Sequence, residues 1–175
     1  MPSSVYPRLQ SSVSETCTHS VSARLAIFDS RVDNLSDLVA GLQPGVQAHI
    51  LDPKQDGIEQ ISALLHPSSA NEITLVAHGF PSGLHLGSST LTLNNLSAYE
   101  HQLRKWFRGA ASPRLTLLAS GVAKGKAGGD FIQQLTALTG AIVRASAQSI
   151  GQGHWLTATA KTFKPVVLNT YRATL

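Results

Sequence analysis

Short apolar runs alternate with segments of helical periodicity along the chain. Apolar runs bounded by Asp, Pro, Gly or Ser predict strands at 23–30, 46–53, 72–78, 114–120 and 141–146, with a last strand at 154–159. Between them, apolar residues at three- and four-residue spacing predict helices at 34–42, 56–66, 97–109 and 129–140. Strands that alternate with helices through short links are typical of a parallel sheet with helices on both faces. We therefore predict an α/β fold, a three-layer sandwich with a mostly parallel sheet.

One segment departs from this alternation. In residues 83–93, every second residue is a leucine on either side of Gly-Ser-Ser, which predicts a small β-hairpin insert.

Two helix starts have capping candidates. Asn34 precedes the first predicted helix, and Asp56 precedes the second with Glu59 three residues further on.

The length and composition predict one domain with a sizeable core. The chain has 175 residues, of which 42% are hydrophobic and 14% charged, as in a globular protein. We predict a disordered Ser-rich tail at 1–22, a single α/β domain at 23–160 and a C-terminal extension at 161–175. The large aromatic residues are interpreted as core, with Trp155 in the core or at an edge: Trp106, Phe107, Phe131 and Trp155.

The charge is unevenly distributed. Residues 1–100 carry a net −5 and residues 101–175 a net +9. The candidate binding residues are the basic ones in the stretch 104–126: Arg104, Lys105, Arg108, Lys124 and Lys126. Such a stretch fits an acidic protein surface, a nucleic-acid backbone or simply a solvated face. With few exposed-looking aromatic residues and no nucleic-acid motif, we expect a protein partner and no nucleic acid.

The sequence shows no pattern typical of a membrane span or a secretory signal. No apolar run approaches the ~20 residues of a membrane span, and the first residues lack the apolar core of a secretory signal. The single cysteine, Cys17, excludes an internal disulfide. We expect a cytoplasmic protein without a membrane span.

Two predicted strand ends carry candidate chemistry. His78 and Gly79 follow the strand at 72–78, and Ser120 and Gly121 follow the strand at 114–120. Because parallel strands end at the same edge of a sheet, His78 and Ser120 are expected to be neighbours there. An imidazole can act as a base for a hydroxyl nucleophile, and the Gly121 amide can stabilise an oxyanion. Equally, the two side chains can hydrogen-bond each other and tie two strand ends together.

Three stretches together resemble a known family. "IFDSRVDNLSDLVAGLQPGVQAHILDPKQDGIEQISALL", "AHGFPSGLHLGSSTLTLNNLSAY" and "GVAKGKAGGDFIQQLTALTGAIVRAS" are similar to the bacterial domain of unknown function DUF4347, from about Ala23 to Trp155. The resemblance implies a caspase-like fold, in which a His-Gly and a Cys at neighbouring strand ends form a catalytic dyad. His78 and Gly79 match the His-Gly, but Ser120 stands where the family has its Cys and Gly121 where it has a polar residue.

Two functional hypotheses follow from this departure. The first is a non-catalytic protein-binding or scaffold module, in which the dyad has lost its sulfur. The second is a Ser/His-dependent peptidase or hydrolase that uses Ser120 and His78. Asp29 and Asp52 can in principle orient His78 from nearby strand ends, although ending a strand or capping a helix is their more ordinary role.

Metal and cofactor sites are not predicted. The seven histidines include no pair at the i, i+4 spacing of a zinc-binding helix. The stretch "DPKQDG" at 52–57 resembles an acidic calcium loop but lacks the closing Glu at the required spacing.

Overall fold

The protein is built around a five-stranded parallel sheet. The computed structural model describes residues 24–66, 70–152 and 154–175. The strands of this sheet are β1 (Arg24–Asp29), β2 (Val46–Leu51), β3 (Glu72–Val76), β7 (Arg114–Leu118) and β8 (Ile142–Arg144). Their order is β2-β1-β3-β7-β8, and every neighbouring pair is parallel. The predicted α/β fold with a mostly parallel sheet is thus confirmed.

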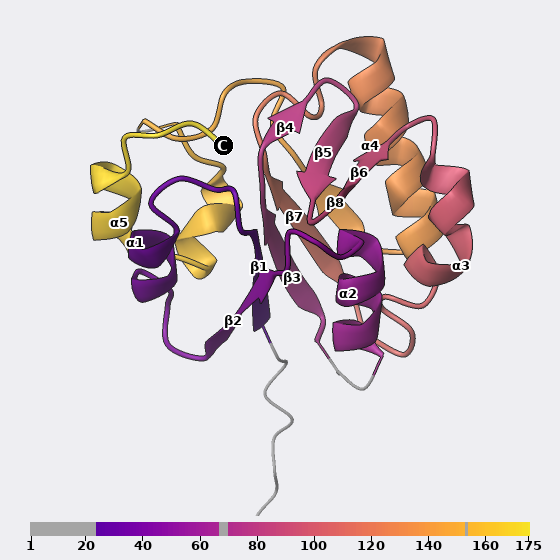
Figure 1. The fold of residues 1–175 in the computed structure, drawn as a ribbon, viewed down its shortest axis with the longest axis horizontal. Coiled ribbons are helices and arrows are strands. Elements are labelled where there is room, and N and C mark those ends of the chain that lie inside the picture. The colour runs from indigo at the N-terminus through magenta and orange to yellow at the C-terminus, as the bar shows by residue number, and fades with distance from the viewer. Residues whose placement is uncertain (1–23, 67–69, 153) are drawn as a thin grey trace, which may run out of the picture.

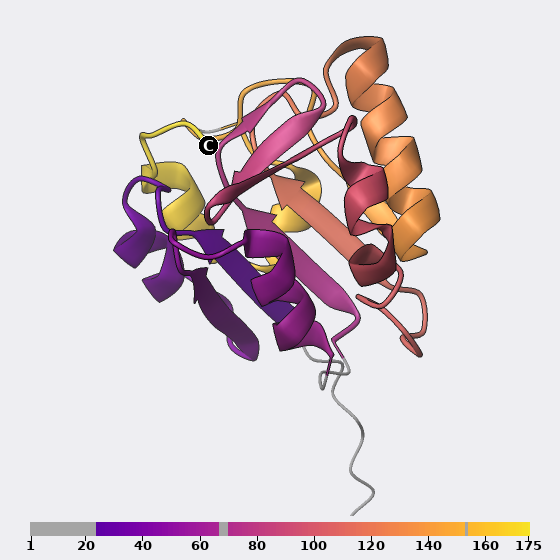
Figure 2. The same ribbon diagram turned by 45° about the vertical axis from the view of Figure 1, so that its right-hand side comes forward.

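Helices cover both faces of the sheet (Figure 1). On one side lie α2 (Gly57–Leu65), α3 (Glu100–Leu103) and α4 (Gly125–Thr139), with the 3-10 helix η1 (Leu96–Tyr99) leading into α3. On the other side lie α1 (Leu35–Ala40), the 3-10 helix η2 (Thr157–Lys161) and α5 (Pro165–Thr170). A view turned by 45° shows β2 at one margin of the sheet (Figure 2).

The predicted hairpin insert is part of a small antiparallel sheet. This sheet contains β4 (Gly79–Phe80), β5 (Gly83–Leu86) and β6 (Ser89–Thr92) in that order. β5 and β6 form the hairpin, with Leu84 opposite Leu91. Both leucines are buried in the core beneath, so the insert covers part of the main sheet.

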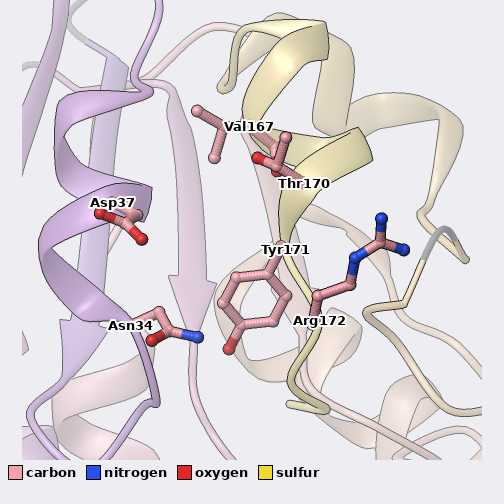
Figure 3. A pocket seen from close by; sticks show the side chains of 6 residues that line it. All are labelled: Asn34, Asp37, Val167, Thr170, Tyr171 and Arg172. Atoms are coloured by element: carbon pink, nitrogen blue, oxygen red, sulfur yellow. The ribbon is translucent and has the colours of Figure 1, made fainter.

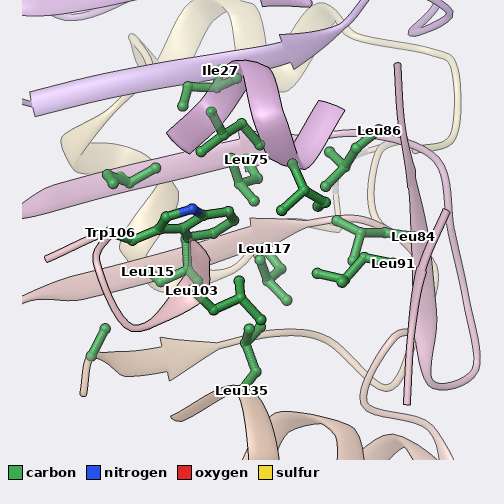
Figure 4. Packing of buried hydrophobic residues seen from close by; sticks show 14 of the residues in the cluster. Ile27, Leu75, Leu84, Leu86, Leu91, Leu103, Trp106, Leu115, Leu117 and Leu135 are labelled. Carbon is green, nitrogen blue, oxygen red and sulfur yellow. The ribbon is translucent and has the colours of Figure 1, made fainter. Parts of the chain in front are cut away.

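Two hydrophobic cores lie on opposite faces of the sheet, because successive strand residues point to opposite sides. On β3, Ile73 and Leu75 contribute to the larger core, whereas Val76 contributes to the smaller one. The larger core packs the leucines of the main sheet and the hairpin against α3 and α4, as Figure 4 shows. Trp106, Phe107 and Phe131 are buried in it, as predicted, and Trp106 Nε1 donates a hydrogen bond to Ser62 Oγ over 2.9 Å.

The last residues belong to the folded unit. The smaller core contains Phe163, Leu168, Tyr171 and Leu175 from the segment 161–175, which the sequence suggested as an extension. Trp155 packs edge-on against Tyr171, with 5.5 Å between ring centroids. These apolar residues are spaced for a short helix and a following extended stretch, and the face of β1 beneath them would be uncovered without them.

Three local predictions need correction. The predicted strand at 154–159 is wrong, since only an isolated bridge at His154 and then η2 are found there. The predicted helix at 97–109 ends at Leu103, after which the chain turns so that Trp106 and Phe107 both point inward. Asn34 adopts a left-handed conformation, with φ of 50°, and its side chain makes no capping hydrogen bond. Asp56, by contrast, accepts from the amides of Ile58 and Glu59 as predicted.

A buried carboxylate organises the end of β1. Asp29 is completely buried, and the Arg31 guanidinium binds both its oxygens, over 2.8 Å and 2.9 Å. Asp29 also accepts from the amides of Arg31 and Gly87, and Arg31 donates to the Gly87 carbonyl. A buried charge is tolerated only when its hydrogen-bonding capacity is satisfied in this way. The ion pair therefore joins the end of β1 to the turn of the β5–β6 hairpin.

These contacts also set the pKa of Asp29. Burial on its own raises this pKa, but the hydrogen bonds from Arg31 and Gly87 and the guanidinium charge outweigh burial, and the pKa falls below 3.8. A lowered pKa in the folded state means that the carboxylate stabilises the fold above the unfolded pKa of about 3.9. This contribution is lost as the pH falls through the lower, folded-state value.

We predict that Asp29→Asn lowers the free energy of unfolding by about 2–4 kcal/mol at neutral pH, because an amide cannot satisfy the same donors. Urea denaturation measures this difference. Asp130→Asn, which breaks the exposed pair with Lys126, should leave the free energy of unfolding almost unchanged. The Asp29→Asn difference should shrink once the pH falls below 3.8. A difference that is equal at pH 7 and pH 2.5 would contradict the assigned role.

Candidate functional site at the carboxyl edge of the sheet

The carboxyl ends of β1, β3 and β7 meet at one edge of the sheet. β3 lies between β1 and β7, so His78, which follows β3, has the end of β1 on one side and Ser120 on the other. The strand order reverses direction between β1 and β3, beside His78, and such points commonly form binding sites in open α/β sheets. His78 and Ser120 thus follow adjacent parallel strands.

His78 is oriented by a backbone carbonyl. Its Nε2 lies 3.1 Å from the carbonyl oxygen of Arg31. Since a carbonyl only accepts hydrogen bonds, Nε2 carries the proton in the neutral ring and Nδ1 carries the lone pair. Asp29 thus acts on His78 indirectly, by fixing the turn that holds Arg31. Asp52 instead closes its own turn by accepting from the Lys54 amide, and β1 separates it from β3.

Gly79 allows the ends of β3 and β7 to approach each other closely. A Cβ at this position would lie 2.7 Å from Ala119 Cβ and 2.8 Å from the Ser120 carbonyl oxygen. Any larger residue would have to push the two backbones apart, because both contacts are part of, or next to, the main chain. The Gly of the His-Gly pair is therefore explained by packing.

The hydrogen-bonding groups of Ser120 and Gly121 are bound to the chain itself. Ser120 Oγ accepts from the Ile150 amide over 2.8 Å, and the Ser120 amide donates to the Leu175 carbonyl over 2.9 Å. The Gly121 amide, which the sequence suggested as an oxyanion donor, donates to the Gln148 carbonyl over 3.0 Å. The suggested hydrogen bond between His78 and Ser120 is replaced by these separate partners.

An open groove of about 500 Å³ lies beside Ser120. Its walls come from the end of β3 with β4, from the loop before α4, and from the segment after β8: Gly79, Phe80, Pro81, Ser120, Gly121, Lys124, Ala147, Gln148 and Ser149. The groove thus combines an apolar wall, exposed polar side chains and one cation. Of its lining residues, sequence reasoning missed Phe80, Pro81 and 147–149, because nothing in their local pattern shows what they pack beside.

His85 is a second imidazole near this edge. It lies on β5, where its Nδ1 is 3.0 Å from Thr90 Oγ1 and its ring is 5.2 Å from the Phe80 ring. Burial lowers the pKa of His85, and the nearby charges of Arg31 and His78 lower it further, while Asp29 opposes them. The hairpin pattern contained this residue, but only the fold brings it near His78.

The candidate basic residues are separated by the fold. Arg104, Lys105 and Arg108 precede β7 and therefore lie toward its amino end, whereas Lys124 and Lys126 follow its carboxyl end. Arg104 pairs with Glu100, and Lys126 pairs with Asp130. Of these five, only Lys124 lines the groove.

A smaller hollow of about 140 Å³ lies between α1 and α5 (Figure 3). Tyr171 forms its base, and its hydroxyl donates to the Asp33 carbonyl over 3.0 Å. Burial, followed by the charge of Asp33, raises the pKa of Tyr171 to about 12, so the phenol remains a donor at neutral pH. Asp37 points toward this hollow, and Arg172 extends away from α1.

Two features are absent from the described residues 24–66, 70–152 and 154–175, a metal-binding cluster and a membrane-spanning helix. No three His, Cys, Asp or Glu side chains among them gather closely enough to hold a metal ion. None of their helices combines the length and apolar character needed to cross a membrane.

Comparison with known proteins gives one match. The family model described as "Domain of unknown function (DUF4347)" matches residues 25–175. The match includes α5 and the last residues of the chain, in agreement with their packing in the smaller core. No curated protein and no solved structure matches the chain.

We predict that Ser120→Ala lowers the free energy of unfolding by about 1–2 kcal/mol, because the Ile150 amide loses its acceptor. Amide hydrogen exchange should become faster at Ile150 and its neighbours in the chain. Ser149→Ala is the matched control, since Ser149 lines the same groove without a comparable contact, and it should leave both measurements unchanged. Unchanged exchange at Ile150 in Ser120→Ala would contradict a structural role for the hydroxyl.

Proposed function

Because the chain belongs to the DUF4347 family and Ser120 is bound to the chain's own backbone, we propose that it is a non-catalytic protein-binding module with a caspase-like fold. The observation that carries this proposal is that three groups at the end of β7 already have hydrogen-bond partners within the chain. These groups are Ser120 Oγ and the amides of Ser120 and Gly121. Hydrolysis by acyl transfer needs a hydroxyl directed at a base and amides directed at the developing oxyanion. Here the two amides donate to the carbonyls of Leu175 and Gln148, and Ser120 Oγ accepts from the Ile150 amide.

The caspase-like assignment rests on the position of the candidate dyad. His78 with Gly79 follows β3, and Ser120 follows the adjacent strand β7. This placement agrees with the family resemblance, in which a His-Gly and a Cys stand at neighbouring strand ends. A serine in the cysteine position keeps the packing volume small but removes the readily ionised thiol. The framework persists while the chemistry is lost, as is common when one fold supports many functions.

The groove beside Ser120 is the proposed binding surface. Phe80 and Pro81 supply an apolar wall, and Lys124 supplies an exposed positive charge without an ion-pair partner in the described part of the chain. An extended peptide segment with an acidic side chain has the matching chemistry. The apolar wall would provide affinity, and the lysine would favour acidic over basic sequences.

The alternative, a Ser/His-dependent hydrolase, has one observation in its favour. The bond from Nε2 to the Arg31 carbonyl leaves the lone pair of His78 on Nδ1, so the ring is prepared to accept a proton. For catalysis, the Ser120 hydroxyl would have to donate its proton to His78, and no hydrogen bond joins the two side chains in the described part of the chain. Catalysis would also need the amides of Ser120 and Gly121 to leave their carbonyl partners.

We predict that the native protein hydrolyses no component of a mixed peptide library and that a fluorophosphonate probe does not label Ser120. Mass spectrometry measures both results, with Ser120→Ala as the background control. Labelling of Ser120 that disappears in His78→Ala would establish the hydrolase instead. Cleavage by Ser120→Cys alone would mean that the geometry of the dyad persists without its nucleophile, which is consistent with a non-catalytic native protein.

We predict that peptide display on the native protein enriches sequences with an acidic residue next to apolar ones. Lys124→Glu should weaken their binding about fivefold to tenfold, since it reverses one exposed charge pair. The matched control is Lys105→Glu, an equally exposed lysine outside the groove, and it should change binding less than about twofold. Fluorescence anisotropy measures the peptide affinity of both variants. Equal losses of affinity would mean that only the net charge of the protein matters, and would contradict the groove as the binding site.

A further inference from the structure

β2 is an edge strand that lacks the usual protection against pairing with another strand. β2 is the last strand of the sheet on its side, and its outer edge has no partner strand among the described residues (Figure 2). Its six residues, "VQAHIL", include no charged residue, no Pro and no Gly. Natural sheets usually protect such edges with lysine, proline, a bulge or a covering segment, because unpaired amides and carbonyls bind other strands.

The exposed side chains of β2 are suited to pairing. Gln47, Ala48 and Ile50 are exposed, and 48% of Ile50 is accessible to solvent. On the face that carries Val46, residues 48 and 50 are thus small or apolar, without a charge that a neighbouring strand would have to bury. The opposite edge differs, since β8 has only three residues and Arg144 is exposed on it.

The charges at the two ends of β2 favour a second copy of the chain as its pairing partner. At its start, the Arg24 guanidinium binds the Pro44 carbonyl over 2.9 Å and lies against Gly45. At its other end, Asp52 is partly exposed, and among the described residues its carboxylate accepts from Lys54 N and Gln55 Nε2. An antiparallel second copy would bring the positive start of one β2 beside the acidic end of the other, twice by symmetry. Lys54 follows Asp52 and is exposed, so this attraction is modest.

We propose that two copies of this chain associate through antiparallel pairing of β2 with β2 around a two-fold axis. Such a contact is isologous, so each copy uses the same edge and no edge of this kind is left over. If the two-fold axis passes residue 48, Ala48 lies opposite Ala48 of the second copy. If the axis passes residue 49, Ala48 lies opposite Ile50 of the second copy. This surface is separate from the groove, so the proposal goes beyond the proposed function and does not rest on it.

The expected association is weak. Six residues a side form an interface at the low end of specific contacts, below about 1,200 Å² in total. Sedimentation velocity of the full chain from about 5 to about 300 µM should therefore show a reversible monomer–dimer equilibrium within this range. Amide exchange in residues 46–51 should slow as the concentration rises, whereas exchange in 142–144 should not.

Ala48→Lys is the decisive variant. It places like charges opposite each other or beside Ile50 of the second copy and should weaken dimerisation at least about tenfold. Ile142→Lys adds the same charge to the other edge at a residue that is 53% exposed, and it should leave the equilibrium unchanged. Ile50→Lys, a second variant on β2, repeats the test if Ala48→Lys alters the thermal unfolding.

Three results would overturn the proposal. The first is a native chain that remains monomeric at about 300 µM, because a contact of this size should be populated at that concentration. A dimer that survives both β2 variants but dissociates in Ile142→Lys would place the interface at β8. Slow exchange of residues 46–51 at every concentration in a monomer would mean that another segment of the same chain covers the edge.

Discussion

The completely buried carboxylate of Asp29 is the constraint on which the carboxyl edge of the sheet depends. A charge in this position requires donors, and the sequence supplies them from Arg31 and from the amide of Gly87, 58 residues further along the chain. Satisfying the carboxylate therefore fixes the turn after β1 and the hairpin above the sheet at the same time. The same turn presents the Arg31 carbonyl to His78. The orientation of the imidazole is thus a consequence of folding around Asp29.

The end of β7 follows a related principle with neutral groups. Ser120 and Gly121 satisfy their hydrogen bonds on the segment 148–150 and on Leu175, which pack against the sheet from later parts of the chain. Partly buried polar groups that are paired in this way stabilise one conformation of the strand ends. A catalytic centre needs the opposite arrangement, with donors held ready for a charge that appears only during the reaction. This contrast is the reason why we propose binding rather than hydrolysis.

The sequence predicted the parts of this arrangement that depend on local pattern. Alternating apolar runs and helical periodicity predict the parallel sheet, and a parallel sheet places His78 and Ser120 at one edge. The partners of those residues were not predictable, because Arg31, Ile150 and Leu175 reach them only through the tertiary fold. The stretch at 154–159 shows the opposite case, in which the local pattern predicts an element that the fold does not contain. Its Trp, Leu and Thr residues have strand propensity, but a strand needs a neighbour to pair with. Trp155 and Leu156 instead pack in the smaller core, and Trp155 donates to the Leu168 carbonyl of α5.

The two proposed surfaces are compatible because the strand order separates them. β2 forms one margin of the sheet, whereas the groove lies at the carboxyl ends of β3 and β7, with β1 between β2 and β3. A dimer through β2 would leave both grooves open. Two linked grooves would bind a partner with repeated acidic segments more tightly than either groove alone, because the second contact forms within the complex at a high effective concentration. Weak individual contacts at both surfaces would then be sufficient for a stable assembly, and neither contact would require Ser120 to act as a nucleophile.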